Sequence, residues 1–209
     1  MAPAVTPEAR AAHWRSVYTT RPPTSRSWYQ AEPRVSLALL DTLGVGPQTA
    51  VLDVGGGASF LADRLVARGF RDVTVLDVAE EALAEVAGRL GRDPRVTLLC
   101  SDLLAFAPTR RYGCWHDRAV LHFLTEDELP AYQAVLRRAL EPGGAVVVGA
   151  FAPDGPEQCS GLPVRRYDPP GLLAALGPGF EAVASEREEH LTPTGALQPF
   201  TWLAARWTG

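Results

Sequence analysis

The sequence contains few cysteines and no spacing that would link them. Its 209 residues include three, Cys100, Cys114 and Cys159, an odd number without a CxxC pair. Neither a disulfide framework nor a zinc knuckle is indicated, so we expect buried free thiols. Internal repeats are also lacking, and the 18 prolines and 19 glycines are spread along the chain rather than clustered. A repeat array or a low-complexity protein is therefore not expected.

Long runs of positive charge and long apolar spans are missing too. The formal net charge is -4 and no extended run of lysine or arginine occurs, which disfavours nucleic acid as a partner. The N-terminus, with Pro3, Pro7 and Glu8, has no charged segment followed by an apolar one, and no stretch is long enough to cross a bilayer. We expect a soluble cytoplasmic protein without a membrane partner.

Apolar strands and amphipathic helices alternate through the first half. With 46% hydrophobic residues, the chain is suited to one domain that buries roughly 70% of its unfolded surface. Continuous apolar runs such as 73–76 and 96–100 are typical of strands covered on both faces, and hence of a parallel sheet. The predicted order is strand 50–54, helix 58–68, strand 72–76, helix 79–90 and strand 95–99.

The second half continues this pattern and then departs from it. A strand near 113–119 and a strand at 145–149 flank a helix over 127–140, whose start has capping-box spacing from Thr125 to Glu128. Asp168 followed by two prolines predicts another helix start. The tail predicts an antiparallel hairpin of 180–191 and 199–207. Upstream, helices are expected over 7–18 and from Pro33 to Gly44.

Three glycines break the first strand before the next helix begins. Gly55, Gly56 and Gly57 follow Asp53 by two to four residues. Glycine permits positive φ and lets a ligand approach main-chain N–H groups, while the helix N-terminus adds partial positive charge. This stretch predicts a cofactor cradle.

The element order and these motifs resemble the class I S-adenosylmethionine (SAM)-dependent methyltransferases over residues 35–207. Asp53, Gly55 and Gly57 meet the family's acid-x-Gly-x-Gly pattern, and a Leu-Glu-Pro-Gly-Gly segment ends at Gly144, before the fifth strand. The resemblance implies a doubly wound α/β fold, with a mostly parallel seven-stranded sheet, an antiparallel C-terminal hairpin and helices on both faces. It also implies SAM as cofactor, S-adenosylhomocysteine as product and no metal. We divide the chain into an N-terminal flap, 1–34, and a methyltransferase domain, 35–209.

The resemblance assigns roles to residues after the second and third strands. Asp77 would bind the ribose hydroxyls, although Glu80 three residues on also suits an N-cap. Val78 would pack against adenine. Asp102 would lie near the adenine amino group with Leu103 beside the ring, unless Asp102 is a solvated turn residue.

Asp53 would hold the amino-acid end of the cofactor, stabilise the glycine turn, or do both. The rival for the glycines is an NAD fingerprint, but Phe60 stands where its third glycine should allow close helix–strand packing. A non-catalytic SAM-binding regulatory module is the alternative from another functional class.

Candidates for catalysis follow the fourth strand. They are Asp117, His116 and His122, with Arg118 as a substrate-binding residue. Strand alternation puts His116 and Arg118 on one face and Asp117 on the other. By its place in the family, Asp117 is the first choice, either touching the acceptor or orienting the cofactor.

Two accessory segments should shape the acceptor pocket. The flap supplies Trp14, Tyr18 and Tyr29 toward the acceptor and Trp28 toward the cofactor, or simply packs on the sheet. The long connection from Phe151 to Tyr167 carries Arg165 and Arg166, which suit an anionic acceptor, with Phe151 and Arg165 as substrate-binding candidates. We expect a small-molecule acceptor ahead of a protein side chain. The sequence does not indicate an oligomeric state.

Overall fold

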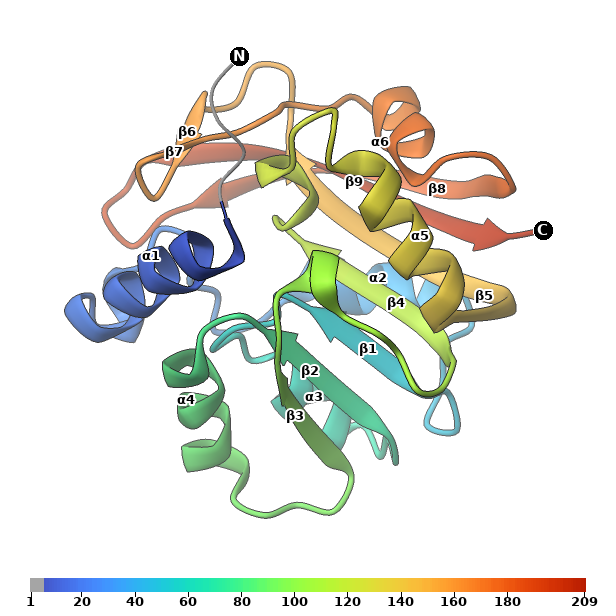
Figure 1. The fold of residues 1–209 in the computed structure, drawn as a ribbon, viewed down its shortest axis with the longest axis horizontal. Coiled ribbons are helices and arrows are strands. Elements are labelled where there is room, and N and C mark those ends of the chain that lie inside the picture. The colour runs from blue at the N-terminus through green and yellow to red at the C-terminus, as the bar shows by residue number, and fades with distance from the viewer. Residues whose placement is uncertain (1–5) are drawn as a thin grey trace.

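A seven-stranded sheet organises the computed structural model, which describes residues 6–209. Pro3 and the first five residues of the predicted flap lie outside the described residues. The strand order is β3-β2-β1-β4-β5-β9-β8 (Figure 1). The predicted doubly wound α/β fold is therefore confirmed.

The first half forms the βαβαβ unit that the sequence predicts. β1 is parallel to both β2 and β4, and β2 is parallel to β3. Gly69 and Gly91, directly or shortly after the two helices, have positive φ, which glycine adopts without strain. The elements are β1 (Val51–Val54), α3 (Leu61–Ala67), β2 (Val73–Asp77), α4 (Glu80–Leu90) and β3 (Val96–Cys100).

The second half ends in the expected hairpin. β9 runs antiparallel to both of its neighbours, β5 and β8. Thr125 N–H does donate to the Glu128 carboxylate (2.9 Å), but α5 begins only at Leu129. The elements are β4 (Tyr112–Arg118), α5 (Leu129–Ala139), β5 (Leu140–Phe151), α6 (Pro169–Leu176), β8 (Phe180–Leu191) and β9 (Leu197–Trp207), with short 3-10 turns η2 (Leu103–Ala105) and η3 (Leu121–Phe123).

One boundary differs from the prediction. The Glu-Pro-Gly-Gly segment that was expected to be a turn lies within β5, which starts at Leu140 rather than Ala145. Leu140 pairs with Tyr112 across a register shift, and Gly143 has positive φ. The glycines therefore bend the strand start instead of separating it from the helix.

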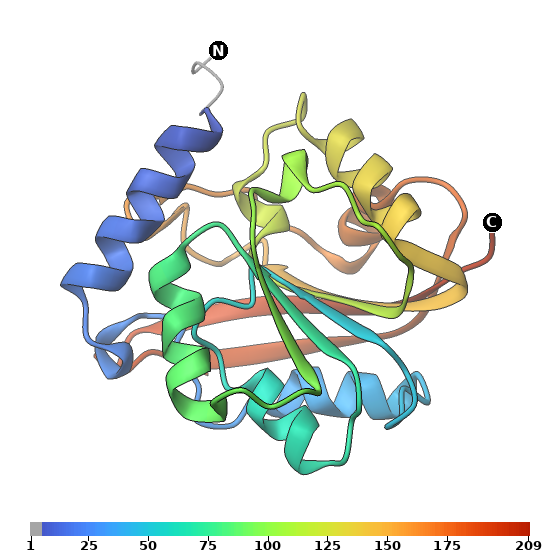
Figure 2. The same ribbon diagram turned by 60° about the horizontal axis from the view of Figure 1, so that its bottom comes forward.

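Helices cover both faces of the sheet (Figure 2). α2 (Arg34–Thr42), α3 and α4 pack on one face around Leu40, Leu65 and Trp202, whereas α5 and α6 pack on the other around Trp115 and Leu136. Because all five side chains are at most 1% exposed, each face has its own core.

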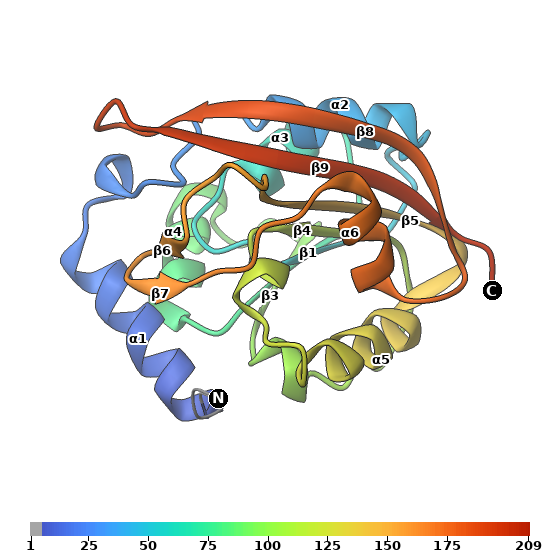
Figure 3. The same cartoon turned by 90° about the horizontal axis from the view of Figure 1, so that it is seen from above.

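The flap lies over the carboxyl ends of the parallel strands. It consists of α1 (Pro7–Thr20) and the turn η1 (Pro23–Ser25), and the Thr6 hydroxyl caps α1 by accepting from Ala9 N–H. Figure 3 shows the short hairpin of β6 (Gln158–Cys159) and β7 (Leu162–Pro163), from the long connection after β5, beside α1. Among the residues that the structure describes, no helix is both long and apolar enough to span a membrane.

Candidate cofactor and acceptor site

Two cavities open where β1, β2, β3 and β4 end. The smaller measures about 310 Å³ and the larger about 440 Å³. Tyr18, Trp28, Gly55 and Arg118 line both, so the cavities meet at the glycine loop under the flap. Open parallel sheets bind ligands at this edge.

The glycine loop is shaped for a close approach. Gly55 and Gly57 have φ of 59° and 53°, which side chains rarely adopt. A Cβ on Gly56 would overlap the Asp53 carboxylate and lie 2.8 Å from a Val75 methyl carbon. Glycine is thus required at all three positions of the predicted cradle, for conformation at two and for space at the third.

A series of buried hydrogen-bonded side chains holds the Asp53 carboxylate in place. Its Oδ1 is 2.7 Å from His116 Nδ1, and His116 Nε2 is 2.9 Å from the Ser36 hydroxyl on α2. These three residues line the smaller cavity and are at most 2% exposed. Within residues 6–209, Asp53 Oδ2 has no hydrogen-bond partner although it is shielded from solvent. A buried carboxylate oxygen of this kind suits a cationic ligand group.

The residues predicted to hold adenosine come together in the larger cavity. Asp77, Val78, Asp102 and Leu103 all line it. Asp77 Oδ1 accepts from Ala79 N–H at 2.8 Å, and burial raises the pKa of this carboxyl to about 6. Asp77 thus makes a local backbone contact, while α4 has no side-chain cap.

Asp102 connects the cofactor wall to the flap. Its Oδ1 accepts from Leu104 N–H (2.8 Å), and its Oδ2 accepts from Arg10 on α1 (2.9 Å). Arg10 also pairs with Glu128 at 2.6 Å. The contact of Arg10 with the cofactor wall is not evident from the sequence, because an arginine on the polar face of a helix normally indicates only solvent exposure.

Tyr18 lies nearer the cofactor wall than its predicted acceptor role implies. A Cβ on Gly57 would overlap its hydroxyl, which is also hydrogen-bonded to the backbone of Ala58. Burial and the nearby Asp77 raise the pKa of Tyr18, so this phenol is neutral. The flap therefore reaches the glycine loop through Tyr18.

Asp117 is enclosed on the side of the sheet that α5 covers. Its Oδ1 accepts from the backbone N–H groups of Val120 (2.8 Å) and Leu121 (3.4 Å), and its Oδ2 accepts from the Tyr132 hydroxyl (2.9 Å). It is 0% exposed, and burial raises its pKa to about 6. It lines neither cavity.

His122 is likewise enclosed. Its ring contacts Phe123 and Phe151, and neither of its nitrogens has a partner. Burial, together with the charge of Arg118, lowers its pKa to about 3, so it is neutral. Of the four residues expected near the acceptor at the end of β4, only His116 and Arg118 reach the cavities.

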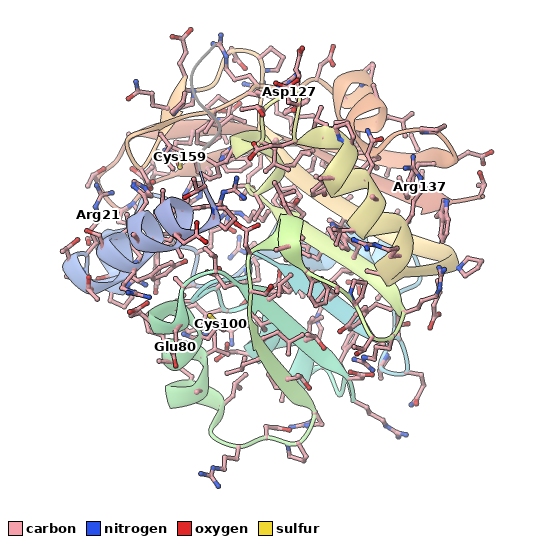
Figure 4. All side chains as sticks on the ribbon, viewed as in Figure 1. Arg21, Glu80, Cys100, Asp127, Arg137 and Cys159 are labelled. Carbon is pink, nitrogen blue, oxygen red and sulfur yellow. The ribbon has the colours of Figure 1, made fainter. Side chains whose placement is uncertain are left out.

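The end of the larger cavity away from the adenosine residues is aromatic and apolar. Trp14 makes edge contacts with Trp28 and with Phe123, at 5.8 and 5.2 Å between ring centroids. Cys159 closes this end from β6, above α1 in Figure 4. Tyr29 lines the smaller cavity instead, and Phe151 and Arg165 line neither. Arg165 pairs with Glu126 and Arg166 with Glu157, both at 3.2 Å.

Comparison with known proteins identifies the family. A family model described as a methyltransferase domain matches residues 51–144. A solved 1,6-didemethyltoxoflavin-N1-methyltransferase of Burkholderia thailandensis, with that compound and S-adenosylhomocysteine bound, is 25% identical, with a TM-score of 0.72 over 100% of this chain and 93% of that one. The chain belongs to the class I SAM-dependent methyltransferases. The N-methyltransferase NodS of Bradyrhizobium japonicum, also solved with S-adenosylhomocysteine, shares the methyltransferase fold at 16% identity, with a TM-score of 0.73 over 96% and 100% of the two chains.

The chain is also similar to curated proteins. The N-terminal Xaa-Pro-Lys N-methyltransferase 1 of Rattus norvegicus is 30% identical over 68% of this chain and 66% of its own. Nodulation protein S of Rhizobium tropici is 29% identical over 54% and 47%. The chain thus spans less than two thirds of the length of these relatives. SAM is the family's cofactor, and the described residues contain no cluster of three His, Cys, Asp or Glu side chains that could hold a metal.

Proposed function

We propose that this protein transfers a methyl group from SAM to a small-molecule acceptor. The observation that carries the proposal is the glycine loop beneath which Asp53 Oδ2 is buried without a partner. SAM presents an ammonium group in its amino-acid moiety, which such an oxygen can accept. Asp77 would take the ribose hydroxyls, and Asp102 with Leu103 would take adenine; all three residues line the larger cavity together with Gly55.

These assignments spread the cofactor across both cavities. Adenosine would occupy the larger cavity beside Asp77, and the amino-acid group would enter the smaller one toward Asp53. SAM supplies a methyl group on a sulfonium, which a nucleophile takes while neutral S-adenosylhomocysteine leaves. The chain's own task is then to align the acceptor and exclude water.

The acceptor would lie at the apolar end of the larger cavity, against Trp14, Phe123 and Cys159. α1 and the β6–β7 hairpin both line this cavity, which favours a small molecule over a protein surface. The Burkholderia relative, named for a small acceptor, agrees with this choice, whereas the rat relative is named for a protein N-terminus.

Asp117, our first choice from sequence, is assigned a structural role instead. All its contacts are to β4–η3 backbone and Tyr132, so it holds the loop after β4 in shape. No catalytic base is needed when the nucleophile is already deprotonated. His116 acts on Asp53 in this proposal rather than on the acceptor.

The proposal is tested with SAM labelled on its methyl group. The protein is mixed separately with the dialysable small molecules and with the protein fraction of a lysate, and S-adenosylhomocysteine formation is measured. We expect turnover and a labelled product in the small-molecule sample. Label in protein would overturn the acceptor class, and SAM binding without turnover in either sample would favour a regulatory SAM-binding module.

A further inference from the structure

Arg118 differs from the other arginines around the cavities. Arg10, Arg26 and Arg89 also line them, and each pairs with a carboxylate: Arg10 with Asp102 and Glu128, Arg26 with Glu85, and Arg89 with Asp63. Arg118 makes no ion pair with any described residue. A cation enclosed beside a ligand cavity therefore lacks a counter-ion from the chain.

The unpaired donors of Arg118 lie on one edge of its guanidinium. Nη1 donates to the Trp28 carbonyl oxygen (3.0 Å), and the guanidinium carbon lies 4.9 Å from the centre of the Phe200 ring. Nε and Nη2 have no partner among the described residues and are shielded from solvent. In arginine these two nitrogens point their N–H groups in parallel, the arrangement that a carboxylate accepts with both oxygens.

Neither of the neighbouring acids, Glu188 and Asp53, forms an ion pair with Arg118. Glu188 accepts from Gln30 and, at 2.9 Å, from Trp202 Nε1, and Asp53 Oδ1 is bonded to His116. These two carboxylates act on Arg118 only through space. A bound ligand is the remaining source of an anion for the free edge of Arg118.

The position of Arg118 relates this edge to the acceptor. Val54 pairs with Asp117 across β1 and β4, so Arg118 is level with Gly55, where the cavities meet. If adenosine and the amino-acid group take opposite cavities, the positive sulfonium lies at this junction. Two positive charges close together in a low-dielectric site repel, and an anion beside them relieves the repulsion.

We propose that the acceptor is a small organic acid whose carboxylate binds the Nε and Nη2 edge of Arg118. Its apolar part lies against Trp14 and Phe123, the aromatic end of the larger cavity. Both nitrogens are shielded from solvent, so binding of the carboxylate requires a shift of the surrounding side chains or of the segment around Trp28, which contacts the same guanidinium. This inference rests on the proposed function, because it names the acceptor class of that site.

The test uses benzoate as a probe and benzamide as its uncharged counterpart of nearly the same shape. Both are titrated calorimetrically into the whole protein, with and without saturating S-adenosylhomocysteine. We expect benzoate to bind and benzamide to bind at least about tenfold more weakly, the loss typical of a charge-assisted hydrogen bond. Arg118→Gln should weaken benzoate about ten- to hundredfold and leave S-adenosylhomocysteine affinity within about twofold. Arg138→Gln, which removes an exposed positive charge on α5, is the matched control.

Each other outcome overturns the inference in a distinct way. Equal affinity for benzoate and benzamide, or no benzoate binding, would contradict the carboxylate. An equal loss of benzoate and S-adenosylhomocysteine affinity in Arg118→Gln would place Arg118 on the cofactor's own carboxylate. Failure of wild-type protein to bind S-adenosylhomocysteine would contradict the proposed function, and the titrations without it would still decide whether the anion site exists.

Discussion

Replacing His116 by Phe tests whether the buried chain beneath the glycine loop positions the cofactor. The substitution removes the 2.7 Å contact to Asp53 and the 2.9 Å contact to Ser36, and leaves both buried groups without that partner. The hydrogen bond to a carboxylate contributes about 1.5–3 kcal/mol and the neutral one about 0.5–1.5 kcal/mol. We therefore expect the free energy of unfolding to fall by about 2–4 kcal/mol, which a domain of ordinary stability survives.

The effect on binding should depend on which part of the ligand touches Asp53. S-adenosylhomocysteine carries the ammonium group, whereas 5′-methylthioadenosine has the adenosine and thioether but no amino-acid moiety. If His116 holds Asp53 for the ammonium, His116→Phe weakens S-adenosylhomocysteine about tenfold or more and leaves methylthioadenosine within about twofold. Titration calorimetry at a temperature where the variant is folded measures both.

Ser36→Ala serves as the matched control. It keeps the contact between His116 and Asp53 and removes only the outer link, so the loss of S-adenosylhomocysteine affinity should be smaller than in His116→Phe. Equal weakening of both ligands in His116→Phe would refute the reasoning, because it would indicate general disorder of the site. Unchanged S-adenosylhomocysteine affinity would refute it as well.

Three further substitutions or conditions separate structural from ligand-binding roles. Tyr132→Phe removes the hydroxyl that donates to Asp117. Denaturant titrations should show the free energy of unfolding lowered by about 1–3 kcal/mol, with S-adenosylhomocysteine affinity unchanged. A loss of that affinity would contradict a purely structural role of Asp117. Gly56→Ala places a Cβ on the Asp53 carboxylate, so S-adenosylhomocysteine binding should be lost while circular dichroism shows the fold retained, and wild-type binding would disprove the close approach. The pKa of Asp77 is raised to about 6, so its carboxyl is protonated below that pH. Because ribose hydroxyls donate to the ionised form, S-adenosylhomocysteine affinity should fall as the pH drops below about 6, by at most about tenfold per pH unit. An affinity that does not change with pH would remove Asp77 from the ribose site.

Periodicity and turn chemistry were sufficient to predict the sheet and most of its helices. Buried strands such as β2 read as continuous apolar runs, and glycines with positive φ, such as Gly69 and Gly91, stand where the intervening helices stop. The start of β5 was missed because its Glu-Pro-Gly-Gly segment has turn-forming residues. Only pairing of Leu140 with Tyr112 extends the strand through it, and that is a tertiary contact.

The parts of the candidate site that lie at a strand end or in the loop after it could be predicted from the sequence. Asp53 lies one residue before the end of β1, Asp77 ends β2 and Asp102 follows β3, so the topology brings them to one edge. Strand alternation also separated His116 from Asp117 correctly, as their contacts on opposite faces show. Alternation cannot predict which of these side chains lines a cavity.

Contacts between distant segments escaped the sequence. Ser36 contacts His116 from 80 residues away, and Glu188, 70 residues after Arg118, accepts from Gln30 and Trp202 and forms no ion pair with Arg118. No local sequence pattern shows which acidic side chains already accept hydrogen bonds from other residues. The charge of the acceptor end is for this reason a property of the folded chain alone.

Calorimetric titration of the wild-type protein with SAM, S-adenosylhomocysteine and NAD tests the central claim most directly. The account predicts one binding site for SAM and S-adenosylhomocysteine, no binding of NAD, and a loss of affinity of about 1–3 kcal/mol in Asp77→Ala, the range for hydrogen bonds to a charged group. Binding of NAD without binding of SAM would contradict it.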